Sequence, residues 1–390
     1  MIKHQNKIEK LIAEFCPNGV ESKSIGEICQ VSRGRVMSKD YLKDNAGEYP
    51  VYSSQTADNG IFGRINTYDY DGEYLTWTTD GAYAGSIFYR NGRFSITNVC
   101  GLLKAKSDNV NMKFLSYILA TVSKKYVSAG MGNPKIMSNV MEKIKIQLPP
   151  LVIQEKIVKI LNSFTELEAE LEAELEARKK QYEHYYFKLL TFELSVARKT
   201  LNEVANFRNG KGHEKHIDEN GKYIVVNSKF VSTGGKVKKY SVGQISPVFR
   251  DDILMVMSDL PNGKALAKCF YVDINDKYTL NQRICALNVK KENELNSKYF
   301  YYALNRNRQL LRYDNGVDQT NLRKDDILKI KIPVPPIKEQ ERIVSILDKF
   351  DALVNNISTG LPAELKARRQ QYEYYRGKLL TFKEKEYAKQ

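Results

Sequence analysis

Few side chains in this sequence are arranged as a catalytic or metal-binding group requires. His213 and His216 lie three residues apart, but no further ligands are spaced to complete a zinc site with them. We interpret the pair as part of a polar loop, with contact to a phosphate or a base as the alternative. No metal ligand is predicted.

Three short motifs resemble catalytic signatures without meeting their requirements. Asn133-Pro134-Lys135 is not the Asn/Asp-Pro-Pro-aromatic motif of an adenine methyltransferase, and no strand–Gly-x-Gly–helix pattern for its cofactor is present. Gly234-Gly235-Lys236-Val237 is not a nucleotide-binding P-loop. Glu364-Leu365-Lys366 matches a nuclease Glu-x-Lys, but its counterpart in an internal repeat described below is Glu174-Leu175-Glu176, on an exposed helix face. No catalytic residue is predicted, and the chain is expected not to be an enzyme.

The composition favours a chain of two or three domains with a polyanionic partner. The 390 residues exceed one ordinary core, and 61 Lys and Arg against 46 Asp and Glu give a net charge of +15. Nucleic acid is preferred to membrane, because no apolar run approaches about 18 residues and the start lacks the pattern of a signal peptide. We expect a cytoplasmic protein whose scattered cysteines are reduced and mostly buried: Cys16, Cys29, Cys100, Cys269 and Cys285.

The strongest pattern is a long internal repeat. Pro149-Pro150 begins a block that recurs at Pro335-Pro336, 186 positions later, with Gln154 answered by Gln340. A second block, residues 173–192, recurs as residues 363–382, 190 positions later. A repeat of this length predicts a duplicated architecture, and such architectures tend to bind two-part or two-fold targets.

Apolar residues at steps of three and four predict a long helix in each copy. The narrow apolar stripes and charged flanks predict that the two helices pair, and a two-fold relation would make the pair an antiparallel coiled coil. Two unrelated amphipathic helices are the alternative. The predicted coiled-coil positions are Ile157, Leu161, Phe164, Leu167, Leu171, Leu175, Tyr182, Ile343, Leu347, Phe350, Leu365 and Tyr372.

The two helical copies differ at one place. The first keeps leucine at every fourth residue through Leu167-Glu-Ala-Glu, Leu171-Glu-Ala-Glu and Leu175-Glu-Ala. The second has four extra residues around Ser358-Thr359-Gly360-Leu361-Pro362, where glycine and proline break or kink a helix. We therefore expect a continuous first helix and an interrupted second. The glutamates between positions 166 and 176 are interpreted as solvated flanks, with subunit docking as the alternative.

The segments at 17–148 and 194–334 are different in kind. They are rich in Gly, Asn, Tyr, Thr and Ser, with short β-branched runs bounded by turn signals such as Asp71-Gly72, Asn91-Gly92 and Asn262-Gly263. Each predicts a mainly β domain with a late helix, at 112–125 in the first and 297–311 in the second. Only the edges of the two segments match, for example Gly34 with Gly210. The predicted class is α+β, with a duplicated frame that carries two diverged readers.

These features together resemble the specificity subunit of a type I restriction-modification system, over essentially the whole chain. The resemblance rests on Pro-Pro-x-x-x-Gln-x-x-Ile at 149–157 and 335–343, Arg-x-x-Gln-Tyr-Glu-x-Tyr at 178–185 and 368–375, and Cys-Pro-Asn-Gly-Val-Glu at 16–21. It implies an N-terminal helix (1–16), a target-recognition domain (17–148), a central helical region (149–193), a second target-recognition domain (194–334), a distal helical region (335–382) and a charged tail (383–390).

The resemblance also implies a function and partners. Each recognition domain would read one half of a split site in double-stranded DNA, and the coiled coil would hold the halves apart. Two methyltransferase (modification) subunits would dock on the helical regions, and restriction (translocase) subunits would join them. S-adenosylmethionine, ATP and Mg are expected on those partners and no cofactor in this chain, because the target adenine would be flipped into the partner's pocket.

Reading bases requires side chains that make paired hydrogen bonds, Arg or Lys to guanine and Asn or Gln to adenine, while Lys and Arg on phosphates supply general attraction. Such residues in loops at the edges and tips of the repeat are the candidate DNA contacts, of which we expect fewer than half to touch a base. In the first domain they are Arg33, Arg35, Ser54, Gln55, Thr79, Asp80, Asn133 and Lys135. In the second they are Arg208, Lys211, His213, Asn227, Lys229, Gln319, Asn321 and Arg323. Trp77 lies in a strand pattern and is predicted to be core.

Two other functions compete with this one. A non-DNA coiled-coil scaffold displaying two protein-binding lobes is disfavoured by the basic charge and by the family resemblance. A gel shift with duplex DNA, with and without methyltransferase subunits, discriminates it. A complete methyltransferase is disfavoured by the missing motifs, and absence of S-adenosylmethionine binding by the isolated chain would exclude it.

Overall fold

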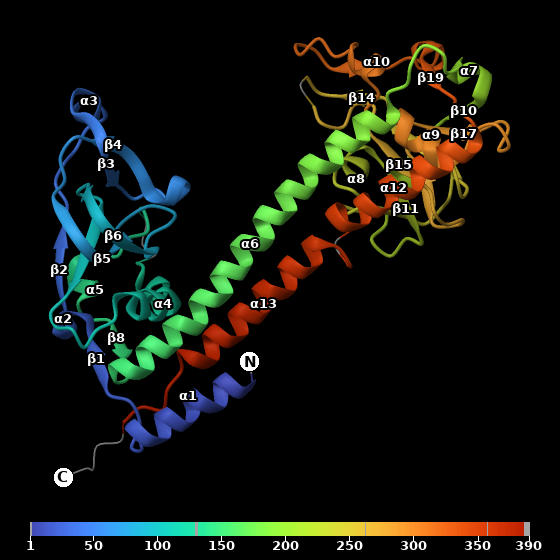
Figure 1. Ribbon diagram of the computed structural model, residues 1–390. Helices are drawn as coiled ribbons and strands as arrows, with labels where there is room; N and C mark the ends of the chain where they lie inside the picture. The colour runs from blue at the N-terminus through green and yellow to red at the C-terminus, as the bar shows by residue number, and fades with distance from the viewer. Residues whose placement is uncertain (1, 129–131, 262, 357, 386–390) are drawn as a thin grey trace. The chain divides into compact units, whose positions relative to one another are not determined.

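The computed structural model describes residues 2–128, 132–261, 263–356 and 358–385 (Figure 1). Predictions that fall on Met1, Gly130, Met131, Asn262, Ile357 and residues 386–390 lie outside the described residues. Contacts divide the chain into two units, Met1–Glu172 with Glu364–Gln390, and Ala173–Ala363. Each unit combines one β domain with parts of both helical regions. The predicted domain boundaries themselves stay predictions.

The first unit is built on a six-stranded sheet in the order β2-β7-β5-β6-β3-β4, in which only the β3–β6 pair is parallel. Helix α4 packs on β5 and β6, and its Phe114 and Leu115 are buried with Leu75 and Trp77 of the sheet. Trp77 is fully buried, as predicted for a core residue. The elements are α1 (Ile2–Phe15), β1 (Ser22–Ser24), α2 (Ile25–Ile28), β2 (Cys29–Arg33), α3 (Lys39–Asp44), β3 (Ala46–Tyr52), η1 (Ala57–Gly60), β4 (Ile61–Ile65), β5 (Tyr70–Thr78), β6 (Ile87–Ile96), β7 (Cys100–Ala105), α4 (Met112–Val122), η2 (Ser123–Tyr126), α5 (Ser138–Met141) and β8 (Lys145–Gln147).

The second unit has a four-stranded sheet, β10-β17-β13-β15, and a three-stranded sheet, β12-β11-β16. Helix α9 packs on β15 and β17, in the place that α4 takes in the first unit. The elements are β9 (Arg198–Thr200), α7 (Leu201–Val204), β10 (Ala205–Asn209), η3 (Glu214–His216), β11 (Tyr223–Val226), α8 (Ser228–Ser232), β12 (Tyr240–Ser241), β13 (Ile253–Val256), β14 (Ser258–Asp259), β15 (Cys269–Tyr271), β16 (Tyr278–Leu280), β17 (Ile284–Val289), α9 (Ser297–Leu304), α10 (Arg308–Leu311), β18 (Thr320–Asn321), α11 (Lys324–Lys329) and β19 (Lys331–Pro333).

Two predicted turns are wrong. Asp71-Gly72 lies inside β5 and Asn91-Gly92 inside β6, and Gly72 faces Gly92 in the antiparallel ladder. Both glycines adopt positive φ, +115° and +100°, which glycine tolerates in an extended ladder as well as in a turn. A dipeptide signal alone therefore does not separate a turn from a kinked strand.

The late helices differ from each other in continuity. In the first unit α4 ends at Val122 and continues as a 3₁₀ turn, close to the predicted 112–125. In the second, the predicted helix 297–311 is broken into α9 and α10. Arg306 takes φ +55° and donates its N–H to the carbonyl of Ala267 at 2.8 Å, and Asn307 then caps α10. A tertiary bond thus overrides the helical pattern.

The helical regions behave as predicted. Helix α6 (Leu151–Leu190) is continuous over 40 residues, whereas the second region is divided into α12 (Ile337–Asn355) and α13 (Leu361–Leu379) (Figure 1). Gly360 stands at the break, and a Cβ there would lie 2.5 Å from the carbonyl oxygen of Ala352. Only glycine therefore fits where the chain folds back against the end of α12.

Aromatic side chains join the helices inside each unit. In the first unit Phe164 of α6 stacks on Tyr375 of α13 with centroids 5.6 Å apart, and Arg369 pairs with Glu168. As the numbers rise along α6 they fall along α13, so these two helices are antiparallel. Ile157, Leu161, Phe164, Ile343, Leu347 and Leu365 are buried, Leu171, Leu175, Tyr182, Phe350 and Tyr372 are half-buried, and Leu167 is 44% exposed.

No helix in the described ranges is long and apolar enough to cross a membrane. Four of the cysteines are buried and Cys16 is partly exposed, and all five are free thiols, as predicted.

Candidate nucleic-acid interface

In each domain, the first strand of the main sheet is followed by a glycine and then by a basic residue. In the first domain β2 leads to Gly34 and Arg35, and in the second β10 leads to Gly210 and Lys211. A Cβ at Gly34 would lie 2.0 Å from the carbonyl oxygen of Ile96, and one at Gly210 would lie 2.0 Å from that of Asn281. The two glycines let one strand end approach a neighbouring loop closely, so that the following cation sits at the same place in both domains.

The basic residue after each glycine lies in an isolated parallel bridge, Arg35 with Thr97 and Lys211 with Asn281. Arg35 is exposed, but its guanidinium is held by Asp69 at 3.1 Å and by the Tyr41 hydroxyl at 3.1 Å. These contacts, with the Tyr41 bond as the larger cause, raise the pKa of Arg35. Lys211 is exposed with no ion pair among the described residues. The second domain thus presents a free cation where the first presents a fixed one.

A second shared feature is a short ladder near the end of each domain. In the first domain Asp80 bridges Lys135, and Thr79 accepts the N–H of Ile136 at 2.8 Å. Lys135 and the neighbouring Asn133 are exposed. The structure therefore brings together predicted DNA contacts that lie about fifty positions apart in the sequence. Thr79 itself is buried, and its hydroxyl donates to the Val99 carbonyl at 2.9 Å.

The second domain repeats this ladder as the β14–β18 pair, with Ser258 opposite Asn321. Gln319 donates to the Ser258 hydroxyl at 2.7 Å, which fixes one end of the ladder. Gln319, Asn321 and Arg323 are all exposed. Amide and guanidinium groups on a short exposed ladder can form the paired hydrogen bonds that distinguish bases.

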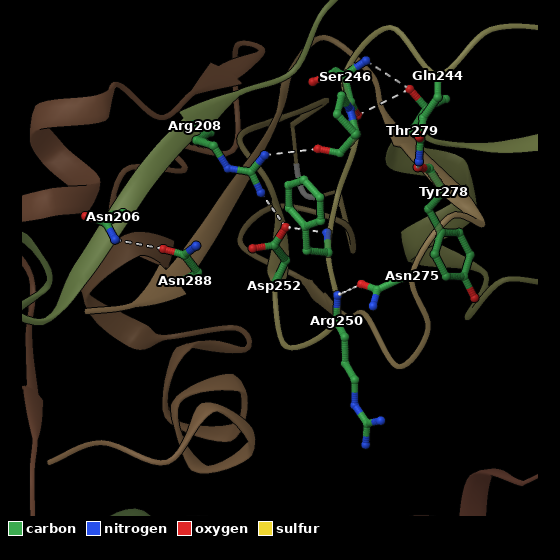
Figure 2. A network of polar contacts seen from close by, with 12 residues as sticks. Asn206, Arg208, Gln244, Ser246, Arg250, Asp252, Asn275, Tyr278, Thr279 and Asn288 are labelled. Carbon is green, nitrogen blue, oxygen red and sulfur yellow. Dashed lines mark hydrogen bonds and ion pairs between the residues drawn. The ribbon is translucent and has the colours of Figure 1, made fainter. Parts of the chain in front are cut away.

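Arg208 is engaged within the protein (Figure 2). Its guanidinium donates to the Pro247 carbonyl at 3.0 Å and pairs with the buried Asp252 carboxylate, which also accepts the Phe249 N–H at 2.8 Å. Burial raises the pKa of Asp252, opposed by those two donors. Arg208 therefore stabilises a buried charge, and a base would have to compete with that role.

His213 is placed differently from its prediction. The sequence surroundings indicate a polar loop, but the ring is 1% exposed. Its Nδ1 lies 2.7 Å from the Lys211 carbonyl oxygen and its Nε2 lies 2.7 Å from the Thr279 hydroxyl. Both ring nitrogens are occupied, so His213 holds the Lys211 loop and offers DNA no free group.

The remaining predicted contacts have mixed roles. Asn227 caps α8 by accepting the Phe230 N–H at 2.8 Å, whereas Lys229 on that helix is exposed. In the first domain Gln55 is exposed but donates to the Ile61 carbonyl, and Ser54 is half-buried in the same loop. Arg33 is exposed and its guanidinium lies 3.2 Å from the Met137 sulfur, beside the ladder.

Comparison with known proteins identifies the family. The model of the type I restriction modification DNA specificity domain matches residues 17–177 and 195–367. A putative type I specificity subunit of Mycoplasma pneumoniae is 32% identical over 93% of this chain and 98% of its own length. The chain belongs to the type I restriction-modification specificity subunits. The duplicated frame is the repeat of the family's own domain, and the domain is one of recognition rather than catalysis.

Other relatives of the specificity subunit agree with this assignment. The specificity subunit of the M. pneumoniae type I restriction enzyme MpnII is 44% identical over 52% of this chain and 62% of its own length. The crystal structure of an S subunit from M. genitalium superposes with a TM-score of 0.60 over 92% of this chain and 96% of that one, at 19% identity. At that identity the likeness shows a common fold, two β domains with long helices.

The specificity subunit also presents groups that the sequence analysis missed. Phe249 is 54% exposed, and the Arg208 guanidinium lies over its ring at 5.4 Å. The exposed side chain of the adjacent Arg250 extends away from this network, while its N–H donates to Asn275 at 2.7 Å (Figure 2). An aromatic residue next to an arginine in a Pro-Val-Phe-Arg turn was the available signal. Within the described ranges no cluster of His, Cys, Asp and Glu could hold a metal ion.

Proposed function

We propose that this specificity subunit directs a type I restriction-modification complex to a bipartite target in double-stranded DNA. Each recognition domain reads one half-site, and the helical regions set the length of the spacer. The bases are read from the exposed ladder and strand-end residues, chiefly Lys135 and Asn133 in the first domain, and Lys211, Gln319 and Asn321 in the second.

One observation carries the proposal. The two domains have the same strand-end glycine and the same late ladder, yet present different side chains there, Lys135 in one and Asn321 in the other. A common frame with different donors is what two half-sites of different sequence require, because lysine and asparagine prefer different bases.

We propose further that two methyltransferase subunits dock on the helical regions and that restriction subunits join them. The partly exposed Leu167 and Leu171, with the exposed Glu166 and Glu170 beside them, offer a docking surface. S-adenosylmethionine, ATP and Mg would bind to those partners, where adenine flipping and methyl transfer occur.

Domain replacement tests the proposal. Exchanging residues 20–145 for the corresponding domain of another specificity subunit should change one half of the methylated motif and leave the other half and the spacer unchanged. Methylome sequencing of cells that carry the exchanged subunit measures this directly. A change in both halves, or no change in either, would refute the proposal that each domain recognises its own half-site.

A further inference from the structure

The motif that opens each helical region, Pro-Pro-x-x-x-Gln, places a glutamine at a fully buried position. Gln154 and Gln340 are both 0% exposed. A buried primary amide with unfilled bonds destabilises a protein, so its partners show what the residue does.

The two glutamines make the same three bonds to the backbone. Gln154 donates to the carbonyls of Pro149 at 2.7 Å and Asn109 at 2.9 Å, and accepts the N–H of Asn111 at 2.9 Å. Gln340 donates to Pro335 at 2.7 Å and Glu294 at 2.9 Å, and accepts the N–H of Asn296 at 2.8 Å. Asn109 and Glu294 have different side chains, but each glutamine bonds to their backbone carbonyl. The two sites therefore have the same hydrogen-bond geometry.

These bonds join the start of a long helix to the start of a domain helix. Asn111 is the N-cap of α4, and Asn296 is the N-cap of α9. Both domain helices pack on the sheet of their recognition domain. Each glutamine therefore ties a recognition domain to the helix that follows it, at one end of their contact.

A second bond ties the same helices further along. The Tyr117 hydroxyl donates to Asn162 at 2.8 Å, and the equivalent Tyr302 hydroxyl donates to Asp348. Eight residues separate Gln154 from Asn162 along α6, about 12 Å of helix. Apolar contact between the helices is non-directional, whereas hydrogen bonds are directional, so two bonds this far apart fix the angle between the helices.

We propose that the pairs Gln154 with Tyr117 and Gln340 with Tyr302 are positioning residues that hold each recognition domain at a fixed angle on its helix. This rests on the proposed function, because the angle then determines where the base-reading ladders meet the DNA. Loss of a pair loosens the spacer length that the complex accepts and leaves the base preference of each half-site intact.

The test uses the full chain assembled with methyltransferase subunits, with Gln154→Met plus Tyr117→Phe, and separately Gln340→Met plus Tyr302→Phe. Methionine keeps the length of glutamine without its bonds. DNA carries the wild-type motif with the spacer at its preferred length or one base pair shorter or longer. Each double variant should reduce the methylation ratio of preferred to altered spacers roughly 5- to 10-fold, with unchanged half-site preference.

A matched control separates positioning from general destabilisation. Leu102→Val changes a separate core cluster of the first domain, which Leu102 forms with Tyr74 and Phe94, whereas Tyr117 packs against a different cluster. It should lower the unfolding midpoint and leave the spacer ratio unchanged. An unchanged ratio in the double variants, or an equal loss of ratio in the Leu102→Val control, would overturn the proposal. If a methionine variant does not fold, Tyr117→Phe and Tyr302→Phe alone should each lower the ratio, and no effect from either counts against it.

The wild-type complex separates the two hypotheses. If the wild-type complex methylates DNA equally at all three spacer lengths, the proposed function and this inference are both refuted. If the wild-type complex prefers one spacer length and the double variants keep the same preference, only the inference is refuted.

Discussion

Phe164 stacks on Tyr375 with ring centroids 5.6 Å apart and an interplanar angle of 27°. Their repeat counterparts, Phe350 and Tyr185, stack in the other unit at 5.5 Å and 24°. In each unit the phenylalanine comes from the helix that follows the recognition domain and the tyrosine from the other helical region. The two clusters have the same composition, and each belongs to a single unit.

The two stacks differ in burial, and this difference predicts unequal energies. Phe164 is 6% exposed, whereas Phe350 is half-buried. Phe164→Ala should cost about 3–5 kcal/mol of unfolding free energy and Phe350→Ala about 2 kcal/mol, because less apolar surface is lost in the second. Hydrogen exchange should report greater loss of protection in α13 for the first than in α12 for the second.

The control for this comparison is the neighbour of one stacked tyrosine. Tyr374 is 56% exposed, so Tyr374→Ala should change the unfolding free energy by about 0.5 kcal/mol or less. Equal loss of protection from Phe164→Ala and Phe350→Ala would contradict the burial argument.

Two asparagines of the second domain are predicted to have opposite roles. Asn321 is exposed on β18, and Asn321→Ala should relax the base preference at one position by about 1–3 kcal/mol without loss of stability. Asn227 caps α8, and Asn227→Ala should lower the unfolding free energy by about 1 kcal/mol while the methylated motif stays the same. Methylation of a target library and denaturant unfolding measure the two effects. The reverse outcome would exchange the roles assigned here.

The sequence predicted those features whose causes are local. A period of three to four residues favours a helix, and glycine with proline at 360–362 interrupts one. The continuous α6 and the divided α12 and α13 were therefore both predicted. The class of the domains followed from short β-branched runs such as Ile253–Val256, which became β13.

Features that depend on distant partners were not readable. His213 lies among polar neighbours in the sequence, but its ring is buried and hydrogen-bonded to Thr279, 66 residues away. Arg208 was predicted to contact DNA, but its guanidinium pairs with the Asp252 carboxylate. The dipeptide Asp71-Gly72 is typical of a turn, and only its pairing with β6 shows that it lies in a strand. At the candidate interface, the loops and glycines could thus be predicted from the sequence. Which side chains are free to contact DNA could not.

The cysteines predict a pH-dependent reactivity. Burial raises the pKa of Cys29, Cys100 and Cys285 to about 12, and raises that of Cys269 well above its usual value. A raised pKa keeps the thiol protonated, and the thiolate is the reactive form. In the folded chain a charged thiol reagent should modify only Cys16, because it is partly exposed and the other four cysteines are buried. Burial raises the pKa of the Cys16 thiol too, so its reaction should become faster as the pH rises from 7 to 9. All five should react in denaturant.

Thiol counting with Ellman's reagent measures this, and Cys16→Ser supplies the control. That variant should show no reactive thiol when folded. A second thiol reacting at native pH would mean that one of the cysteine sites opens more readily than its burial indicates.

The continuity of α6 predicts that its length is adjustable. Deleting residues 171–174 removes one Leu-Glu-Ala-Glu unit, about 6 Å of helix and slightly more than one turn, so the apolar stripe keeps nearly the same face. Glu176 then takes the place of Glu172, which pairs with Arg369. With 3.4 Å per base pair, the preferred spacer should shorten by one or two base pairs while both half-sites stay the same.

Methylome sequencing of cells that carry this deletion reads spacer and half-sites together. Removing only residues 171 and 172 is the matched control, because it shortens α6 by about 3 Å but rotates its far end by roughly 200°. That change separates the apolar stripe from its partners, so methylation should fall at every spacer length rather than move to a shorter one. An altered half-site with an unaltered gap in the four-residue deletion would show that α6 does not set the spacing.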